Sequence, residues 1–218
     1  MSVSTITVGG QSVTLVSTPA KPNLRSVEFQ MLDQVGMVPS TFTGQIAQAQ
    51  AWPGADLLSA TLTLPPLTSD QEDDWAAFLM QMRGQFCAFL WGDPTRQTPR
   101  GTFAGTPVVD GTVTGGNPAM SQMLALKGFT HSATGVAVRG DYIQVGYRLY
   151  RNLDNANADS SGKAVLNIYP SLRESPADGT SIVTTATKGL WRLATNKRGY
   201  SKDVTRLAKM SFQIQEYR

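Results

Sequence analysis

The stretch from Ser69 to Asp93 decides the fold of this chain, and it reads SDQEDDWAAFLMQMRGQFCAFLWGD. It opens with four carboxylates and continues into an apolar run; the carboxylates are Asp70, Glu72, Asp73 and Asp74. Carboxylates this close together can hold a metal ion or transfer protons. They can also form the polar start of a helix, where negative charge meets the positive end of the helix dipole. The first interpretation would indicate an enzyme, and the second would indicate a structural protein.

The spacing of the next residues predicts a helix over 70–83. Four apolar side chains recur at i, i+3, i+4 and i+7 and so share one helix face; they are Trp75, Phe78, Leu79 and Met82. Ser69 and Glu72 have the spacing of a capping box. Arg83 falls in the last turn, and Gly84 can adopt the left-handed conformation that ends a helix. The four acids are therefore predicted to mark where a helix begins.

The segment after this helix, FCAFLW at 86–91, predicts a buried strand. Cys87 lies within it and is the only cysteine, so the chain can form no internal disulfide. Its apolar neighbours predict that Cys87 is a small buried core residue.

Most of the remaining chain alternates apolar and polar residues, which is typical of strands. The segment 4–16 does so on both sides of Gly9–Gly10, which predicts a hairpin. Two Pro/Gly-rich breaks, GDPTRQTPRGT at 92–102 and RESPADGT at 173–180, bracket the middle of the chain. We therefore predict a mainly β protein in which 1–93 and 177–218 form one discontinuous domain and 94–176 form an inserted domain.

Composition restricts the partners. Charged residues make up 16% of the 218 residues, against about a quarter in typical soluble domains, and the net charge is +3. The basic excess lies late in the chain, at Lys188, Arg192, Lys197, Arg198, Lys202, Arg206, Lys209 and Arg218. These residues are spread among strand-like segments, which favours a solvated surface over a nucleic-acid site.

The N-terminus lacks a signal-peptide pattern and no apolar run is long enough to span a bilayer, so we expect a soluble protein made in a cytoplasm.

Three further motifs are candidate sites of chemistry. His131 is the only histidine, whereas a zinc site needs several ligands and a catalytic base needs a nucleophile and an orienting partner. DNANADSSG at 154–162 lacks the glycine and the bidentate glutamate of a calcium loop, and it predicts a turn between two strands. RGD at 139–141 precedes a strand and is typical of a tight turn. We predict no catalytic, cofactor-binding or metal-binding residues, and no enzyme.

Several segments, taken in order, resemble a known family. They are STFTGQIAQAQAWPGADLLSATLTLPPLT, DDWAAFLMQMRGQFCAFLWGDP, RGTFAGTPVV, GDYIQVGYRLYR, SSGKAVLNIYPSLRESPADGT and LWRLA. This order is similar to tail proteins of long-tailed bacteriophages, and most similar to the distal tail protein of the tail tip. The most distinctive piece is the Trp-x-x-Phe-Leu helix followed by Arg-Gly and an aromatic strand that ends in Gly-Asp-Pro.

The resemblance implies a structural protein of the virion tail tip, assembled in the bacterial host cytoplasm. It implies a homohexameric ring built from a β-barrel or sandwich with one helix, and an inserted OB-like β-barrel on the outside. The implied partners are the tail tube protein and the tail hub or baseplate proteins, with DNA passing through the ring and no membrane insertion. No catalytic residue is implied.

Two alternatives stay open, a neighbouring tail-tube-end protein and a tail module that binds host-surface carbohydrate. For the second, four aromatic residues in strand patterns could stack on a sugar ring: Phe129, Tyr142, Tyr147 and Tyr150. Their positions within strands favour core or interface packing.

Overall fold

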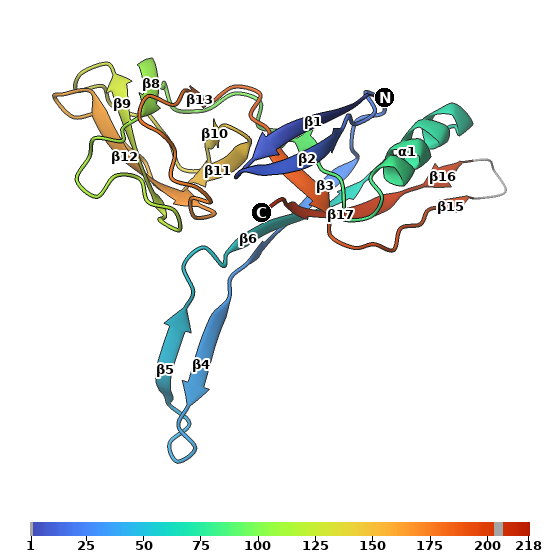
Figure 1. Cartoon of the computed structure of the whole chain (residues 1–218), viewed down its shortest axis with the longest axis horizontal. Helices are drawn as coiled ribbons and strands as arrows, with labels where there is room; N and C mark the ends of the chain where they lie inside the picture. The colour runs from blue at the N-terminus through green and yellow to red at the C-terminus, as the bar shows by residue number, and fades with distance from the viewer. Residues whose placement is uncertain (1, 203–206) are drawn as a thin grey trace.

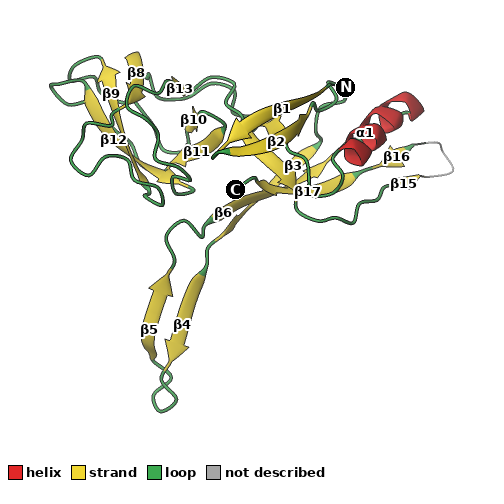
Figure 2. Ribbon diagram, in the orientation of Figure 1, coloured by secondary structure: helices red, strands yellow, loops and turns green. Residues whose placement is uncertain are grey.

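The computed structural model describes residues 2–202 and 207–218, and this part of the chain is mainly β with one α-helix, as the sequence predicts (Figures 1 and 2). A five-stranded antiparallel sheet forms the centre. Its strands, in spatial order, are β3 (Ser26–Leu32), β6 (Leu57–Thr63), β17 (Ser211–Glu216), β14 (Gly189–Leu193) and β7 (Phe89–Trp91). The strands come from both ends of the chain. For example, β7 and β14 pair directly, although a long middle segment separates them in the sequence.

The N-terminal hairpin forms a separate two-stranded sheet beside the central one. It consists of β1 (Val3–Val8) and β2 (Gln11–Val16), and its turn is at Gly9 and Gly10, as predicted. Both glycines have positive φ, 56° and 78°, which suits a tight hairpin turn. Leu15 forms a parallel bridge with Ala88, so β2 lies beside the entry to β7. The hairpin also packs against Leu90 of β7 and Leu190 of β14.

Helix α1 (Ser69–Gln81) packs on one face of the central sheet, with its bounds slightly displaced from the prediction. The predicted N-cap Ser69 is wrong, because Thr68 occupies that position in extended conformation. The predicted capping-box partner Glu72 is also wrong. Gln71 has this role, since the Thr68 N–H donates to Gln71 Oε1 at 3.2 Å. The helix ends at Gln81 and not in the predicted last turn at Arg83. Arg83 and Gly84 both have positive φ, 48° and 70°, so the chain turns away there.

The predicted apolar helix face is confirmed, because its four residues are all buried. Trp75 packs edge-on against Phe78, with ring centroids 5.7 Å apart, and Phe78 packs edge-on against Phe89 at 5.4 Å. Trp75 also contacts Phe212 of β17, at 6.0 Å. Cys87 is buried in the same core, as predicted, whereas Phe86 at the start of the predicted strand is exposed and the strand begins at Phe89.

The middle of the chain forms a nearly closed six-stranded antiparallel sheet, hereafter the barrel. Its strands, in spatial order, are β13 (Ile182–Val183), β10 (Tyr142–Val145), β11 (Arg148–Asn152), β12 (Lys163–Tyr169), β9 (Met123–Phe129) and β8 (Gly105–Val109). A bridge between Val108 and Ser181 brings the two edge strands together. The division into domains at 94 and 176 stays a prediction, and the last barrel strand lies beyond the second of these positions.

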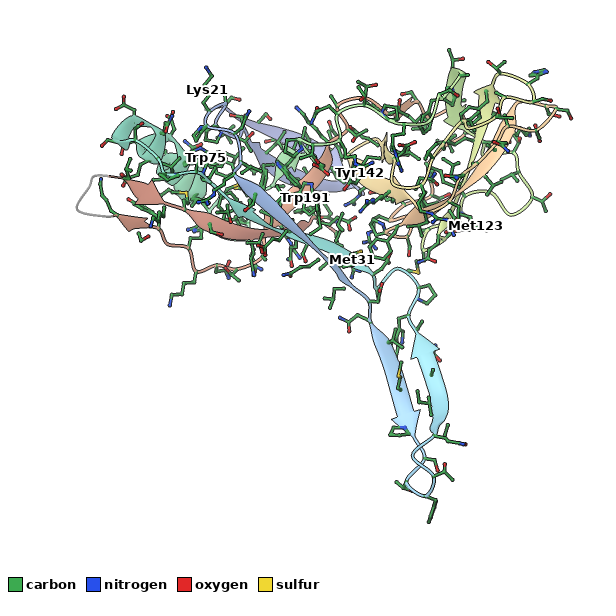
Figure 3. The ribbon with its side chains drawn as sticks, turned by 180° about the vertical axis from the view of Figure 1, so that it is seen from behind. Lys21, Met31, Trp75, Met123, Tyr142 and Trp191 are labelled. Atoms are coloured by element: carbon green, nitrogen blue, oxygen red, sulfur yellow. The ribbon has the colours of Figure 1, made fainter. Side chains whose placement is uncertain are left out.

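The barrel and the central sheet share packing. Tyr142 and Leu149 of the barrel belong to the same apolar cluster as Trp191 of the central sheet (Figure 3). A Cβ placed on Gly189 would lie 2.7 Å from the Leu149 Cβ, so the two backbones approach closely there. The chain also enters and leaves the barrel at one point, since a Cβ on Gly92 would lie 1.9 Å from the Thr187 carbonyl oxygen.

A two-stranded arm projects from the central sheet, as Figure 1 shows. The arm consists of β4 (Val35–Pro39) and β5 (Ile46–Ala51), which continue outward from β3 and β6. The remaining short pair, β15 (Ser201–Lys202) and β16 (Ala208–Lys209), lies near α1 (Figure 2). None of the described helices is both long and apolar enough to cross a membrane.

Candidate assembly surface

The acidic quartet lies at the start of α1 and is not gathered around a site. Asp70, Asp73 and Asp74 are exposed, whereas Glu72 is buried. The Glu72 carboxylate pairs with the Lys202 ammonium at 2.8 Å, and this hydrogen bond raises the pKa of Lys202. Within 2–202 and 207–218, no three His, Cys, Asp or Glu side chains are grouped to hold a metal ion.

His131 and the calcium-like segment both lie in turns. His131 is exposed. In the segment 154–162, which joins β11 to β12, Asp159 Oδ1 accepts the N–H groups of Ser161 and Lys163, each at 2.8 Å. The bond from Lys163 comes first among the causes that hold the pKa of Asp159 below its usual range. Asp159 thus stabilises a turn through its Oδ1.

The RGD segment also has a structural role. Asp141 is buried, and its carboxylate accepts the N–H groups of Arg100, Gly101 and Val138 at 2.8–2.9 Å. Gly140 has φ 90°, which few other residues adopt. An adhesion receptor could not reach this carboxylate without unfolding the turn.

Three of the four aromatic residues weighed for sugar stacking are buried. Phe129 and Tyr150 lie in the barrel core, Tyr142 lies where the barrel meets the central sheet, and only Tyr147 of the four is partly exposed. Among the late basic residues from Lys188 to Arg218, the described ones are exposed except Arg192, which is half-buried, and Arg206 lies outside the described residues.

The arm is the feature that the sequence reasoning missed. No Asp, Glu, Lys, Arg or His occurs between Gln34 and Ala55. Nevertheless, large apolar side chains on the arm are open to solvent, with Phe42 at its tip 98% exposed, Met37 59% and Trp52 52%. Monomeric proteins rarely leave so much contiguous apolar surface uncovered. An uncharged run bounded by Asp33 and Asp56 is the sequence signal that could have marked this segment.

The two faces of the arm differ in chemistry. Directly opposed residues of an antiparallel pair share a face. The register pairs Val35 with Ala51 and Met37 with Ala49, and these four form the apolar arm face. On the other side Gly36 lies opposite Gln50 and Val38 opposite Gln48, which form the glutamine arm face. The first face is wholly apolar, whereas the second mixes Gln48 and Gln50 with the exposed Val38 and with the Trp52 ring, which lies over Gly36.

The long edges of the arm are open within the described chain. β4 pairs with β5 alone, and β5 with β4 alone. Exposed edges usually carry Lys, inward charges or several prolines, which prevent pairing with another molecule. Here the arm carries only Pro39, which lies at a register shift near the tip. Its edges are thus free to pair with strands of a partner.

A buried ionic network, the Arg173 network, fixes the base of the arm. The Arg173 guanidinium donates to both oxygens of Glu216, at 2.9 and 2.6 Å, and to Asp56 Oδ1 at 3.2 Å. Ser171 Oγ donates to Asp56 Oδ1 at 2.8 Å. All three charged side chains are buried. The network joins the arm base, the segment after β12 and the C-terminal strand β17 into one rigid corner.

A cavity of about 550 Å³ lies beside this corner. It is lined by Asp33, Trp52, Met120, Gln122 and Tyr169, among others. The Tyr169 hydroxyl donates to Asp33 Oδ1 at 3.3 Å. Burial first, and then the charge of Asp33, raise the pKa of Tyr169 to about 12, so the phenol keeps its proton at neutral pH.

No protein-family model matches this chain, and no curated protein gives a significant match to it.

Proposed function

We propose that this protein is a structural, non-enzymatic subunit of the tail tip of a long-tailed bacteriophage. In this proposal it is a distal tail protein whose hexameric ring joins the tail tube to the hub or baseplate and lets DNA pass. The observation that carries the proposal is the exposed, uncharged arm. The sixfold symmetry rests on the sequence resemblance.

The energetics of the arm favour a bound state. Each large apolar side chain that leaves water contributes about 1.5–3 kcal/mol, so the exposed side chains of this arm favour association. Neither β4 nor β5 has a second sheet layer within the described chain. The arm therefore resembles a structural element whose core is completed by another molecule.

A second copy of the chain is the partner that fits the arm best. The arm has no charge, so two arms can lie together without like-charge repulsion or the desolvation of an unpaired ion. Its two edges belong to different strands, so the β4 edge of one copy can pair with the β5 edge of the next. Contacts between two different surfaces of identical subunits form rings when the rotation closes.

The ring proposal is tested by electron microscopy and mass photometry of the purified full-length protein. Wild type should form a closed ring with six subunits. Met37→Lys and Ala49→Lys place charges on the apolar arm face and should abolish the ring. Both positions are exposed in the single chain, so the melting temperature of the subunit should stay within experimental error of the wild type.

Gln50→Lys is the matched control, because it adds the same charge on the glutamine arm face. It should form rings as the wild type does. A wild-type protein that stays monomeric at high concentration would contradict the proposal, as would rings that tolerate both charges on the apolar face.

A second candidate, carbohydrate binding, is favoured by one observation. The cavity at the arm base combines Trp52 and Tyr169 with the carboxylate of Asp33 and the amide of Gln122. Aromatic rings and such polar groups together are suited to sugar rings. Saturable quenching of tryptophan fluorescence by host cell-wall oligosaccharides, lost in Trp52→Ala, would support this candidate; an unchanged spectrum would oppose it.

A further inference from the structure

An apolar cleft lies on the face of the central sheet that carries α1. It has a volume of about 200 Å³ and is bordered by the segment 18–24, which joins β2 to β3. Lys21 of this segment and Trp75 of α1 are labelled in Figure 3. The apolar wall comes from α1 and from three strands of the sheet, and it consists of Leu62, Trp75, Phe89, Trp91 and Phe212. This hollow is called the aromatic cleft below.

The aromatic cleft has the properties of an unfilled binding site. Lys188 is the only charged residue among the described residues that line it. A cavity of about 150 Å³ with apolar walls can hold a benzene ring, so the larger aromatic cleft has room for a phenyl group. Trp75 adds a polar requirement, because its buried indole N–H has no acceptor among the described residues, and such a donor destabilises a fold. The aromatic cleft is therefore suited to an occupant that combines an aromatic ring with a carbonyl oxygen.

The tip of the arm presents a phenyl group to solvent. Phe42 is 98% exposed, more than any other large apolar side chain in the described residues. It lies in the turn 40–44, which the Gly44 N–H closes by donating to the Ser40 carbonyl oxygen at 2.9 Å. The N–H groups of Phe42 and Thr43 donate to Ser40 Oγ, each at 3.4 Å. Turns mostly use Gly, Pro, Asn, Asp and Ser, so the turn itself does not call for an aromatic residue at this position.

We propose that Phe42 of one copy inserts into the aromatic cleft of another copy. This inference rests on the self-assembly proposed above. The arm points away from the rest of the molecule, so its tip does not reach the aromatic cleft of its own chain (Figure 1). The tip carries no charge and enters an apolar site without the desolvation of an ion. Its backbone supplies carbonyl oxygens beside the ring.

The contact joins two different surfaces of identical chains. A projection on one copy and a cleft on the next form a heterologous contact, which repeats from copy to copy and closes into a ring when the rotation allows it. Only the turn at the tip enters the aromatic cleft. The strands β4 and β5 stay available for the pairing described above.

Other exposed apolar side chains fit the aromatic cleft less well. Phe86 is 69% exposed and Met80 is 68% exposed, but Met80 lies within α1 and Phe86 follows it closely, so neither projects. Trp52 of the arm is already engaged, because a Cβ placed on Gly36 would lie 2.7 Å from its ring. Among these side chains, Phe42 alone combines a free ring with a place at the end of an uncharged projection.

The proposal is tested by disulfide crosslinking of assembled full-length protein. Thr41→Cys places a thiol beside Phe42, and Asn23→Cys places one at the rim of the aromatic cleft. Subunits with one or the other change are mixed, assembled and oxidised, and the Asn23→Cys subunit carries a tag so that a mixed dimer has its own mass. Cys87, the only native cysteine, is 3% exposed and gives a low background. Ser161→Cys, at an exposed turn of the barrel, replaces Asn23→Cys in the matched control.

The mixture of Thr41→Cys and Asn23→Cys should give the mixed dimer, and the mixture with Ser161→Cys should not. Rings without the mixed dimer would overturn this inference and leave the proposed function intact. Equal crosslinking to Asn23→Cys and Ser161→Cys would also overturn it. Wild-type protein that forms no rings would instead refute the proposed function, and this inference with it.

A second measurement removes the ring from the tip. Phe42→Ala should raise the protein concentration at which half of the subunits are in rings by about 10- to 100-fold, because the phenyl group no longer leaves water. Mass photometry over a dilution series measures this concentration. Phe86→Ala removes the same ring from another exposed position and should leave it unchanged. Equal values for Phe42→Ala and wild type would contradict the insertion.

The melting temperature of dissociated subunits provides the control for folding. It should be the same in Phe42→Ala as in wild type, since the side chain is 98% exposed in the single chain. A loss of rings in Phe42→Ala is then a loss of contact between copies. A lower melting temperature of the Phe42→Ala subunit would show that the ring packs within its own chain, and would overturn the inference.

Discussion

At the residue scale, Trp75 is expected to contribute strongly to stability. Its indole packs between Phe78 and Phe212 and is buried. Trp75→Ala should lower the free energy of unfolding by about 3–5 kcal/mol, because it removes buried apolar surface and leaves a cavity. Urea unfolding measures this. Phe42→Ala, a truncation at a 98% exposed position, should change the same quantity by less than about 0.5 kcal/mol.

Asp110 should make the barrel sensitive to acid. The Lys163 ammonium donates to its buried carboxylate at 2.8 Å and Thr112 Oγ1 donates at 2.6 Å, and these bonds hold the pKa of Asp110 well below its usual range. Because the folded pKa lies below the unfolded value of about 3.9, this stability is present at neutral pH and is lost as pH falls below about 5. The melting temperature should therefore decline less steeply from pH 7 to 3 in Asp110→Asn than in wild type. In the control Asp73→Asn, it should decline as steeply as in wild type.

At the element scale, the start of α1 tests a correction to the sequence interpretation. Thr68 followed by Gln71, and Ser69 followed by Glu72, both match a capping box. The structure uses the first pair, and Glu72 pairs with Lys202. Thr68→Ala should thus cost about 0.5–2 kcal/mol in thermal unfolding, and Ser69→Ala clearly less. A larger loss of stability in Ser69→Ala than in Thr68→Ala would mean that Ser69 is the N-cap after all.

The elements differ in how far the sequence could predict them. The apolar face of α1 and the strands around Phe129 and Phe212 follow from local periodicity, because their own chain covers them. The arm alternates in the same way, as from Ala47 to Ala51, but periodicity cannot tell whether an apolar face meets its own chain or a partner. The exact helix start could not be predicted either, because two local signals match a capping box and the tertiary contact between Glu72 and Lys202 is not visible in the sequence.

At the scale of the whole molecule, the Arg173 network should hold the parts together. Arg173→Met leaves two buried carboxylates, Asp56 and Glu216, without their partner, which costs about 3–5 kcal/mol. Hydrogen exchange should increase together at the arm base, after β12 and in β17. Arg139→Met, which removes a guanidinium from a largely exposed side chain, should leave exchange at these sites unchanged. Increased exchange at only one segment would mean that the network does not couple them.

The entry and exit of the barrel meet at Gly92 and Thr187, while β7 and β14 pair just beside them. The two strands would keep their partners if a short turn replaced everything between them. The barrel is thus attached as an insertion, and recombination between related genes could exchange it if the new segment replaced the contacts that Tyr142, Leu149 and Arg173 make with the central sheet. Selection could then change the surface that the barrel presents while the pairing of β7 with β14 stays intact.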